Sequence, residues 1–386
     1  MSIANRLAEP PTPPETTGQM DLGPDGGEFR DIKSEQPITD WTDIFLRFKL
    51  DPASFEIVDD TVRMNTWQQS KRTENGDRDI INLYSYRAQF RRVTEDAVDL
   101  PALYAEGRRK PRAQVKTAPA QRVTVVALSD VQAGKVDHRG GTPELIDRLA
   151  GMRERLTAHL KQRKPQQTVL AEVGDLFEGF ESGGNPLFTN DLSLAQQMDL
   201  AGTELYRFLE VMQRHGRVDV VAVTSNHTSW RRGKQNLGRP GDDLGLFVHR
   251  QVEKVAHAAG IDAHWTTPTM YEESVTIDVL GTRVGVVHGN QFGPGQAVTW
   301  WQKQQHGGGA TALADILLTG HYHNLTVMPS GRNPATGRAK WWLQAPTTDS
   351  GSSWFANASG GTDSDPGLLV FDVTENGFDL SSLTVL

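Results

Sequence analysis

Polar side chains of the metal-ligating kind lie along the chain in five short groups. The groups are Asp130-Val-Gln132, Gly174-Asp175, Asn226-His227, His288 and His321-Tyr-His323. Carboxylate, amide oxygen and imidazole nitrogen are the ligands that divalent metal ions bind in proteins. The chain has no cysteine, which excludes thiolate sites and disulfides and leaves oxygen and nitrogen as ligands. We therefore predict a metal site built from these groups.

Short apolar runs of the buried-strand type precede these groups. The first three runs are Val123–Leu128, Val169–Val173 and Val218–Thr224. Between the first two, Leu145, Leu149 and Met152 repeat at helical spacing, whereas the part from Ser274 to Val373 is mainly strand-like. Alternating strands and helices followed by strands predict an α/β sandwich in which a second sheet covers the first. Strand ends of such a sheet can bring polar side chains to one point.

A binuclear hydrolytic site is the chemistry that best matches this set. Two divalent ions ~3.5–4 Å apart lower the pKa of a bridging water and hold the nonbridging oxygens of a phosphate ester. Asp175, at a strand end after a glycine, fits the carboxylate that such a site needs between its ions. Asp130 and Gln132 are two residues apart, as are His321 and His323, so each pair projects in one direction if its strand continues.

The order of the motifs resembles that of the calcineurin-like metallophosphoesterase superfamily over residues 122–375. The family pattern D-x-H, G-D, G-N-H, H and G-H-x-H is matched here by D-x-Q, G-D, S-N-H, H and G-H-x-H. The resemblance implies a four-layer αββα sandwich with two mixed β-sheets. It also implies two metal ions. The ligands of the first would be Asp130, Gln132, Asp175 and His323. Those of the second would be Asp175, Asn226, His288 and His321.

The same resemblance implies the catalytic roles. A hydroxide bridging the two metals would attack phosphorus, Asn226 would help to stabilise charge, and His227 would assist the leaving group. Glu178 matches an acidic residue that orients this histidine in some relatives. Retention of His227 favours an enzyme over a binding module that uses the same fold.

Three positions depart from the family pattern. Gln132 stands where the family has histidine, and its harder oxygen favours Mn²⁺, with Mg²⁺, Fe²⁺ and Zn²⁺ as alternatives. Ser225 replaces a glycine and would be strained if its turn requires a positive φ. Gly179 stands where phosphoprotein phosphatases carry an arginine, which argues against that subfamily. In its D-x-Q motif the chain is similar to bacteriophage-encoded members of the superfamily.

Aromatic and basic residues near the motifs indicate a nucleic-acid substrate. Stacking on tryptophan and cationic phosphate contacts are the means by which single strands are held. The candidates are Trp230, Arg231, Arg232 and Lys234, with His306 beside the flexible stretch Gly307–Gly309 as a substrate-loop residue. Trp341 and Trp342 are expected in the core. The remaining histidines, including His249, are expected on the surface or on helix faces.

Changes in composition along the chain, including segments rich in proline and glycine, predict the domain organisation. Residues 1–38 are rich in Pro, Gly and acidic residues and predict a disordered leader, 39–95 a small accessory α+β module, 96–121 a linker and 122–386 the metallophosphoesterase domain. The net charge of −8 argues against a nucleic-acid coat protein. No apolar run is long enough for a membrane span, and the N-terminus lacks a signal-peptide core, so we expect a cytoplasmic protein, in the host cytoplasm if phage-encoded.

Phosphodiester hydrolysis of DNA, as an exo- or endonuclease similar to bacterial double-strand-break repair exonucleases, is the function that we predict. DNA would then be the partner, and the N-terminal module is a candidate site for a protein partner. A phosphoesterase for nucleotides or other small phosphates is the first alternative. A catalytically silent scaffold that binds partners through the same fold is the second.

Overall fold

The chain divides into two compact units, Met1–Ala97 and Val98–Leu386. The structure is a computed structural model. It describes residues 18–23, 26–72, 78–92, 121–180, 190–232, 235–349, 351–353 and 365–386. The predicted linker 96–121 lies outside the described residues except for residue 121. No helix in these ranges is both long and apolar enough to cross a membrane.

In its described residues, the first unit is an antiparallel five-stranded sheet with one short helix. Its elements are β1 (Gln19–Gly23), β2 (Gly26–Ser34), α1 (Thr42–Arg47), β3 (Phe55–Ile57), a 3₁₀ turn η2 (Asp59–Thr61), β4 (Arg63–Arg72) and β5 (Arg78–Arg92). The strand order is β1-β2-β5-β3, and β4 also pairs with β5. Aromatic rings of Phe29, Phe45, Phe55 and Phe90 form its core.

The disordered leader predicted for residues 1–38 is wrong where β1 and β2 lie. Phe29 and Ile32 of β2 are fully buried against β5. In a regular strand every second residue faces the core, so two core residues three positions apart do not give the alternating pattern that indicates a strand. A register shift between Phe29 and Ile32 puts both side chains on the core face.

The second unit is built on two mixed sheets. The first has the order β11-β8-β7-β6-β17-β18 and the second the order β12-β13-β14-β16-β15. The strands of the first sheet are β6 (Arg122–Leu128), β7 (Gln167–Glu172), β8 (Arg217–Ala222), β11 (Ala263–Thr266), β17 (Leu369–Thr374) and β18 (Gly377–Val385). Those of the second are β12 (Ser274–Val279), β13 (Thr282–Val287), β14 (Ile316–Thr319), β15 (Thr326–Arg332) and β16 (Ala339–Gln344).

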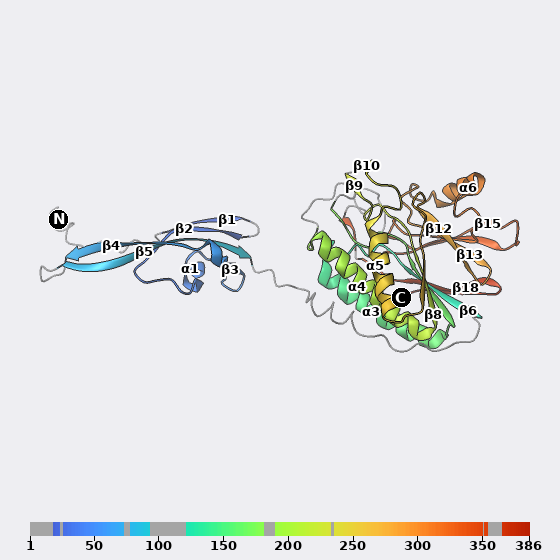
Figure 1. Ribbon diagram of the computed structural model, residues 1–386, viewed down its shortest axis with the longest axis horizontal. Helices are drawn as coiled ribbons and strands as arrows, with labels where there is room; N and C mark the ends of the chain where they lie inside the picture. Colours follow the sequence, from blue (N-terminus) through green and yellow to red (C-terminus); the bar gives the residue numbers. More distant parts are fainter. Residues whose placement is uncertain are drawn as a thin grey trace, which may run out of the picture. The chain divides into compact units, whose positions relative to one another are not determined.

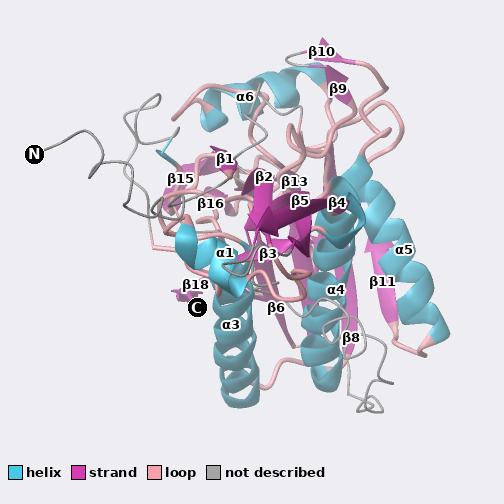
Figure 2. Cartoon of the chain, turned by 90° about the vertical axis from the view of Figure 1, so that its left-hand side faces the viewer, coloured by secondary structure: helices cyan, strands magenta, loops and turns pink. Residues whose placement is uncertain are grey.

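Helices cover the outer face of each sheet. The helices are α3 (Thr142–Arg163), α4 (Leu194–Met212) with a 3₁₀ extension η4 (Gln213–His215), α5 (Leu244–Ala258) and α6 (Ala297–Gly307). Helices α3, α4 and α5 run side by side (Figures 1 and 2). A two-stranded ribbon, β9 (Arg231–Arg232) with β10 (Gln235–Asn236), follows the loop after β8.

Three hydrophobic cores separate the four layers. Alternate residues of β6 face opposite ways, since Val126 and Leu128 pack under the three helices whereas Val125 and Ala127 pack between the sheets. Trp301 of α6 is buried against the outer face of the second sheet beside Trp342, so both tryptophans are core residues. The four-layer αββα sandwich with two mixed sheets that the sequence predicts is confirmed.

Candidate metal centre

The predicted ligands lie in the loops that follow β6, β7, β8, β13 and β14. Backbone hydrogen bonds hold these loops together. The amide of Asp130 donates to the Gly174 carbonyl at 3.1 Å, and that of Gln132 donates to the Asp175 carbonyl at 2.9 Å. The Gly320 amide donates to the His288 carbonyl at 2.7 Å. Segments far apart in sequence therefore present their side chains at one edge of the two sheets.

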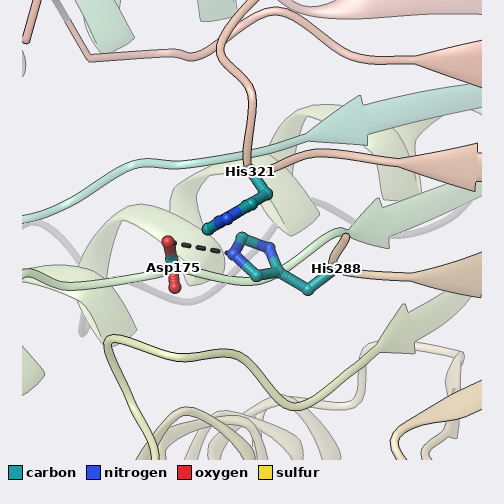
Figure 3. A group of neighbouring side chains, drawn as sticks. All are labelled: Asp175, His288 and His321. Carbon is teal, nitrogen blue, oxygen red and sulfur yellow. Dashed lines mark ion pairs between the residues drawn. The ribbon is translucent and has the colours of Figure 1, made fainter. Parts of the chain in front are cut away.

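Asp175, His288 and His321 form a group suited to a metal ion. One potential ligand atom from each lies within 4.8 Å of the other two. Nε2 of His288 lies 3.0 Å from Oδ2 of Asp175 and 3.1 Å from Oδ1 of Asn226. Figure 3 shows the His288 ring directed at the Asp175 carboxylate and His321 entering from a separate loop. With Asn226, these are the four residues that the sequence assigns to the second ion.

The residues assigned to the first ion are arranged differently. Nε2 of His323 lies 3.2 Å from Oδ1 of Asp130, and Oδ2 of Asp130 accepts from the His321 amide at 3.1 Å. Oε1 of Gln132 accepts a hydrogen bond from Nζ of Lys135 at 2.9 Å. In the described ranges, the Asp175, His288 and His321 group is the one set of three acidic or histidine residues close enough to hold a metal.

Backbone strain is concentrated at the predicted ligands. In the described part of the chain nine non-glycine residues have positive φ, and five of them are Asp130, Gln132, Asp175, His321 and His323. Such conformations cost about 1–3 kcal/mol each and persist where the surrounding structure imposes them, often at functional sites. This concentration is independent of the side-chain contacts, and it supports a functional role for these loops.

Ser225 does not have the positive φ that would strain it, so the predicted strain is absent. Its hydroxyl accepts a hydrogen bond from the Asp175 amide at 2.9 Å and lies 2.8 Å from the Thr228 hydroxyl. Gly174, in contrast, has a φ of +98°. A Cβ atom there would lie 2.5 Å from Nδ1 of His288, so only glycine lets that ring approach. The same Nδ1 lies 2.8 Å from the Val173 carbonyl oxygen, a contact that fixes the ring.

His227 lies beside the metal group and is held by Glu178. Its Nδ1 lies 2.9 Å from the Glu178 carbonyl oxygen and 3.2 Å from Oε2 of the Glu178 carboxylate. Its Nε2 lies 3.7 Å from Oδ2 of Asp175. Because Nδ1 is engaged by Glu178, Nε2 is the nitrogen that faces the metal group. These contacts place Glu178 where it can orient the ring, and the orienting role that the resemblance implies for it stays a prediction.

The charges of the site shift several pKa values. Burial alone would lower the pKa of His227, but Asp175 and Glu178 outweigh it and raise the pKa to about 10. Burial is likewise outweighed at His288, mainly by Asp175, and its pKa rises to about 9. Burial and the neighbouring His288 lower the pKa of His321 to about 3. Despite burial, the neighbouring histidines hold the pKa of Asp175 well below its usual range.

These residues fit a divalent cation. A buried carboxylate and two imidazole nitrogens converge from different strands, with an amide oxygen beside them, which is the donor set that Mn²⁺, Fe²⁺ and Zn²⁺ accept. His321 is neutral and ready to act as a ligand, because its pKa is low. His288 must lose a proton to bind a metal, so metal binding at this site releases protons.

A polar cavity of about 230 Å³ adjoins Asn226. Its lining is Thr224, Ser225, Asn226, Ser229, Arg231, Asn236, Glu273, Asn290 and Gln291. Nη1 of Arg231 donates to the Asn226 carbonyl oxygen at 3.0 Å, which ties the β9–β10 ribbon to the site. Five lining residues were not predicted from the sequence, because no strand-end motif marks them: Ser229, Asn236, Glu273, Asn290 and Gln291.

The remaining substrate candidates are placed as follows. Trp230 has an exposed fraction of 54%, and Arg232 is exposed on β9. Lys234 lies outside the described residues. His306 is exposed in the last turn of helix α6, directly before Gly307–Gly309, so it belongs to a helix end, and its role toward a substrate stays a prediction. Helix α6 persists because buried residues such as Trp301 anchor it to the second sheet.

Solved structures show weak likenesses to the chain. A single mutant of Vps29 from Entamoeba histolytica has 14% identity and a TM-score of 0.30, with 68% of this chain and 97% of that chain covered. A putative 5'-nucleotidase from Staphylococcus aureus has 14% identity and a TM-score of 0.30, and the match covers 69% of this chain and 54% of that chain. The calcineurin-like phosphoesterase YfkN from Bacillus subtilis has 15% identity and a TM-score of 0.28, and the match covers 69% of this chain and 90% of that chain.

No protein-family model matches the chain, and no curated protein matches it. With TM-scores of 0.30 or less, the structural likenesses carry no weight for function. The function must follow from the geometry of the site.

Proposed function

We propose that the chain is a metal-dependent phosphodiesterase that acts on nucleic acid, with DNA as the preferred substrate. One observation carries this proposal. His227, with Nδ1 held by Glu178, directs Nε2 toward Asp175, which itself belongs to the metal group. A metal site beside an oriented proton donor is a combination suited to hydrolysis of a phosphate ester whose leaving group is an alkoxide.

The residues divide the work as follows. Asp175, His288 and His321 would hold a divalent ion, which when bound would stabilise charge on the phosphoryl oxygens and lower the pKa of a water. Nε2 of His227 gives a proton to the departing alkoxide, and Glu178 keeps the ring oriented. Nδ2 of the Asn226 amide can donate to a phosphoryl oxygen while Oδ1 stays near His288.

The β9–β10 ribbon supports a nucleic-acid substrate. Arg231 lines the cavity beside Asn226, Arg232 is exposed next to it, and Trp230 presents an exposed ring directly before the ribbon. With a base stacked on Trp230 and its phosphate near Arg231, a nucleic-acid strand would be held in the way that single-strand-binding proteins hold theirs. Phage origin, likeness to repair exonucleases and a protein partner for the N-terminal unit stay predictions.

A substrate comparison tests this proposal. The Mn²⁺-loaded full chain should hydrolyse bis(p-nitrophenyl) phosphate and should also degrade single-stranded DNA, while circular and linear strands separate endo- from exonuclease activity. Trp230→Ala should raise KM for DNA and leave hydrolysis of the chromogenic diester unchanged. Phe247→Ala, which removes another exposed aromatic ring, on helix α5, is the matched control. Cleavage of the chromogenic diester with all DNA left intact would refute the substrate assignment.

One observation favours a second candidate, a phosphoesterase for nucleotides. The cavity beside Asn226 is small and lined by Asn236 and Asn290, whose amides can pair with the polar edge of one base. The amide of Gln291, also in the lining, is hydrogen-bonded to the Gly289 amide and the Glu273 carboxylate. Under this alternative, Asn290→Ala would impair turnover of cyclic or linear mononucleotides, and DNA would not be cleaved at all. A side-by-side assay of both substrate classes decides between the candidates.

A further inference from the structure

A buried lysine lies beside the metal centre at the position that departs from the family pattern. Nζ of Lys135 donates to Oε1 of Gln132 at 2.9 Å, to Oδ2 of Asp349 at 2.8 Å and to the Gly351 carbonyl oxygen at 3.1 Å. An ammonium group has three N–H donors, so these three oxygens account for all of them. Lys135 is therefore fixed in place, and its hydrogens are used by the protein.

The charge of Lys135 is only partly compensated by its carboxylate partner. Oδ1 of Asp349 also accepts from Nη2 of Arg148 at 3.1 Å, so one carboxylate serves two cations. Lys135, Gln132 and Asp349 have exposed fractions of 9%, 4% and 6%, so solvent screens the charges of Lys135 and Asp349 poorly. Three acceptor oxygens around Nζ call for three N–H donors, which only the ammonium form of the side chain has.

This cation competes with a metal ion for Gln132. An ion bound to Oε1 would lie ~2.1 Å from that oxygen. Because Nζ is 2.9 Å from the same oxygen, the two positive charges would be at most ~5 Å apart. Their repulsion is strong in a buried site. The site assigned to the first ion is disfavoured for this reason, whereas the Asp175, His288 and His321 group has no lysine bound to its ligand atoms among the hydrogen bonds described.

We propose that Lys135 is a resident cation that replaces the first metal ion, so that the chain binds one divalent ion tightly, the one assigned to Asp175, His288 and His321, and not two. Glutamine at position 132 then serves to accept the ammonium of Lys135, and its oxygen is not a metal ligand. The pair Asp130 and His323 remains as a hydrogen-bonded support for the loop that carries His321. This inference rests on the metal-binding part of the proposed function and is independent of the substrate.

Metal counting on the full chain tests the proposal without any activity assay. After equilibrium dialysis against Mn²⁺, mass spectrometry for bound metal should give one ion per wild-type chain, and the electron paramagnetic resonance spectrum should show no coupled Mn²⁺ pair. Lys135→Met should bind a second Mn²⁺ at least tenfold more tightly than the wild type does. Lys340→Met removes a similarly buried ammonium, one that lies over Trp301, and should leave the count at one.

A second variant keeps the test decisive if Lys135→Met does not fold. Gln132→Ala should retain the single Mn²⁺ with its affinity within about threefold of wild type, because Gln132 is not a ligand of that ion. Two ions of similar affinity in the wild-type chain, or loss of a bound ion in Gln132→Ala, would overturn the proposal. A chain that binds one ion but does not cleave phosphodiesters would refute the proposed function and leave this inference standing.

Discussion

Gly174→Ala should disrupt the metal centre through a single added methyl group. Gly174 has a φ of +98°, and a methyl carbon added there would lie 2.5 Å from Nδ1 of His288 and 2.8 Å from Cβ of Ser225. The backbone conformation costs about 1–3 kcal/mol for an L-residue. Displacing the neighbours from a packed site costs about 1–3 kcal/mol more. The free energy of unfolding should therefore fall by about 2–6 kcal/mol.

Gly174→Ala should also weaken metal binding, because the added methyl group displaces the His288 ring, which is a proposed metal ligand. Moving His288 breaks its 2.8 Å contact with the Val173 carbonyl oxygen. Loss of such a support lowers metal affinity by about 10–100-fold. Calorimetric titration with Mn²⁺ measures this affinity. Thermal unfolding without metal measures stability, where about 2 °C of Tm per kcal/mol gives a fall of about 4–12 °C.

Gly281→Ala is the matched control. Gly281 has a similar requirement, a φ of +74°, but nothing lies within 4 Å of its added Cβ. It should lose about 1–2 kcal/mol from the backbone alone and keep its affinity for Mn²⁺. If Gly174→Ala lost no more stability than Gly281→Ala and bound Mn²⁺ equally well, the close approach of His288 to Gly174 would not be what organises the site.

Three other predictions concern catalysis, pH and metal removal. His227→Ala should retain Mn²⁺ and lower kcat on DNA by about 10²–10⁴-fold, with a smaller loss on a p-nitrophenyl ester, whose leaving group needs no proton; equal losses would contradict the role of His227. Burial raises the pKa of Asp243 to about 6, so its contribution to stability is complete below pH ~4 and is lost as the pH rises through 6. Urea denaturation should show that the wild type loses about 3 kcal/mol of unfolding free energy between pH 4 and 7 through Asp243, and that Asp243→Asn does not lose this amount. Equal losses in the two proteins would contradict this. Chelation with EDTA should lower the Tm of the wild type more than that of Asp175→Ala.

The strands that carry the site could be predicted because their signals are local. Each buried strand is a short apolar run, and the polar residue that follows it, such as Asp130 or Asp175, lies where the sheet ends. Parallel neighbours β6, β7 and β8 then bring those residues to one edge. Order along the chain was therefore enough to place the ligands in adjoining loops.

The features that the sequence hides depend on contacts between distant residues. Lys135 meets Asp349 across 214 positions, and His249 meets Glu172 across 77. His249, predicted on the surface or on a helix face, lies on a face of helix α5 and has an exposed fraction of 1%. That face packs on the first sheet, where the Glu172 carboxylate lies 3.2 Å away. No periodicity in the sequence predicts that Lys135 pairs with Asp349 or that His249 pairs with Glu172.

Anomalous diffraction from crystals of the full chain grown with Mn²⁺ tests the central claim most directly. The difference map at the manganese edge should show a peak within coordination distance of Asp175, His288 and His321. It should show no second peak of similar height between Asp130 and Gln132, where Lys135 supplies the positive charge. Absence of a peak at the three ligands, or a manganese ion elsewhere in the chain, would contradict the metal centre from which the proposed activity is derived.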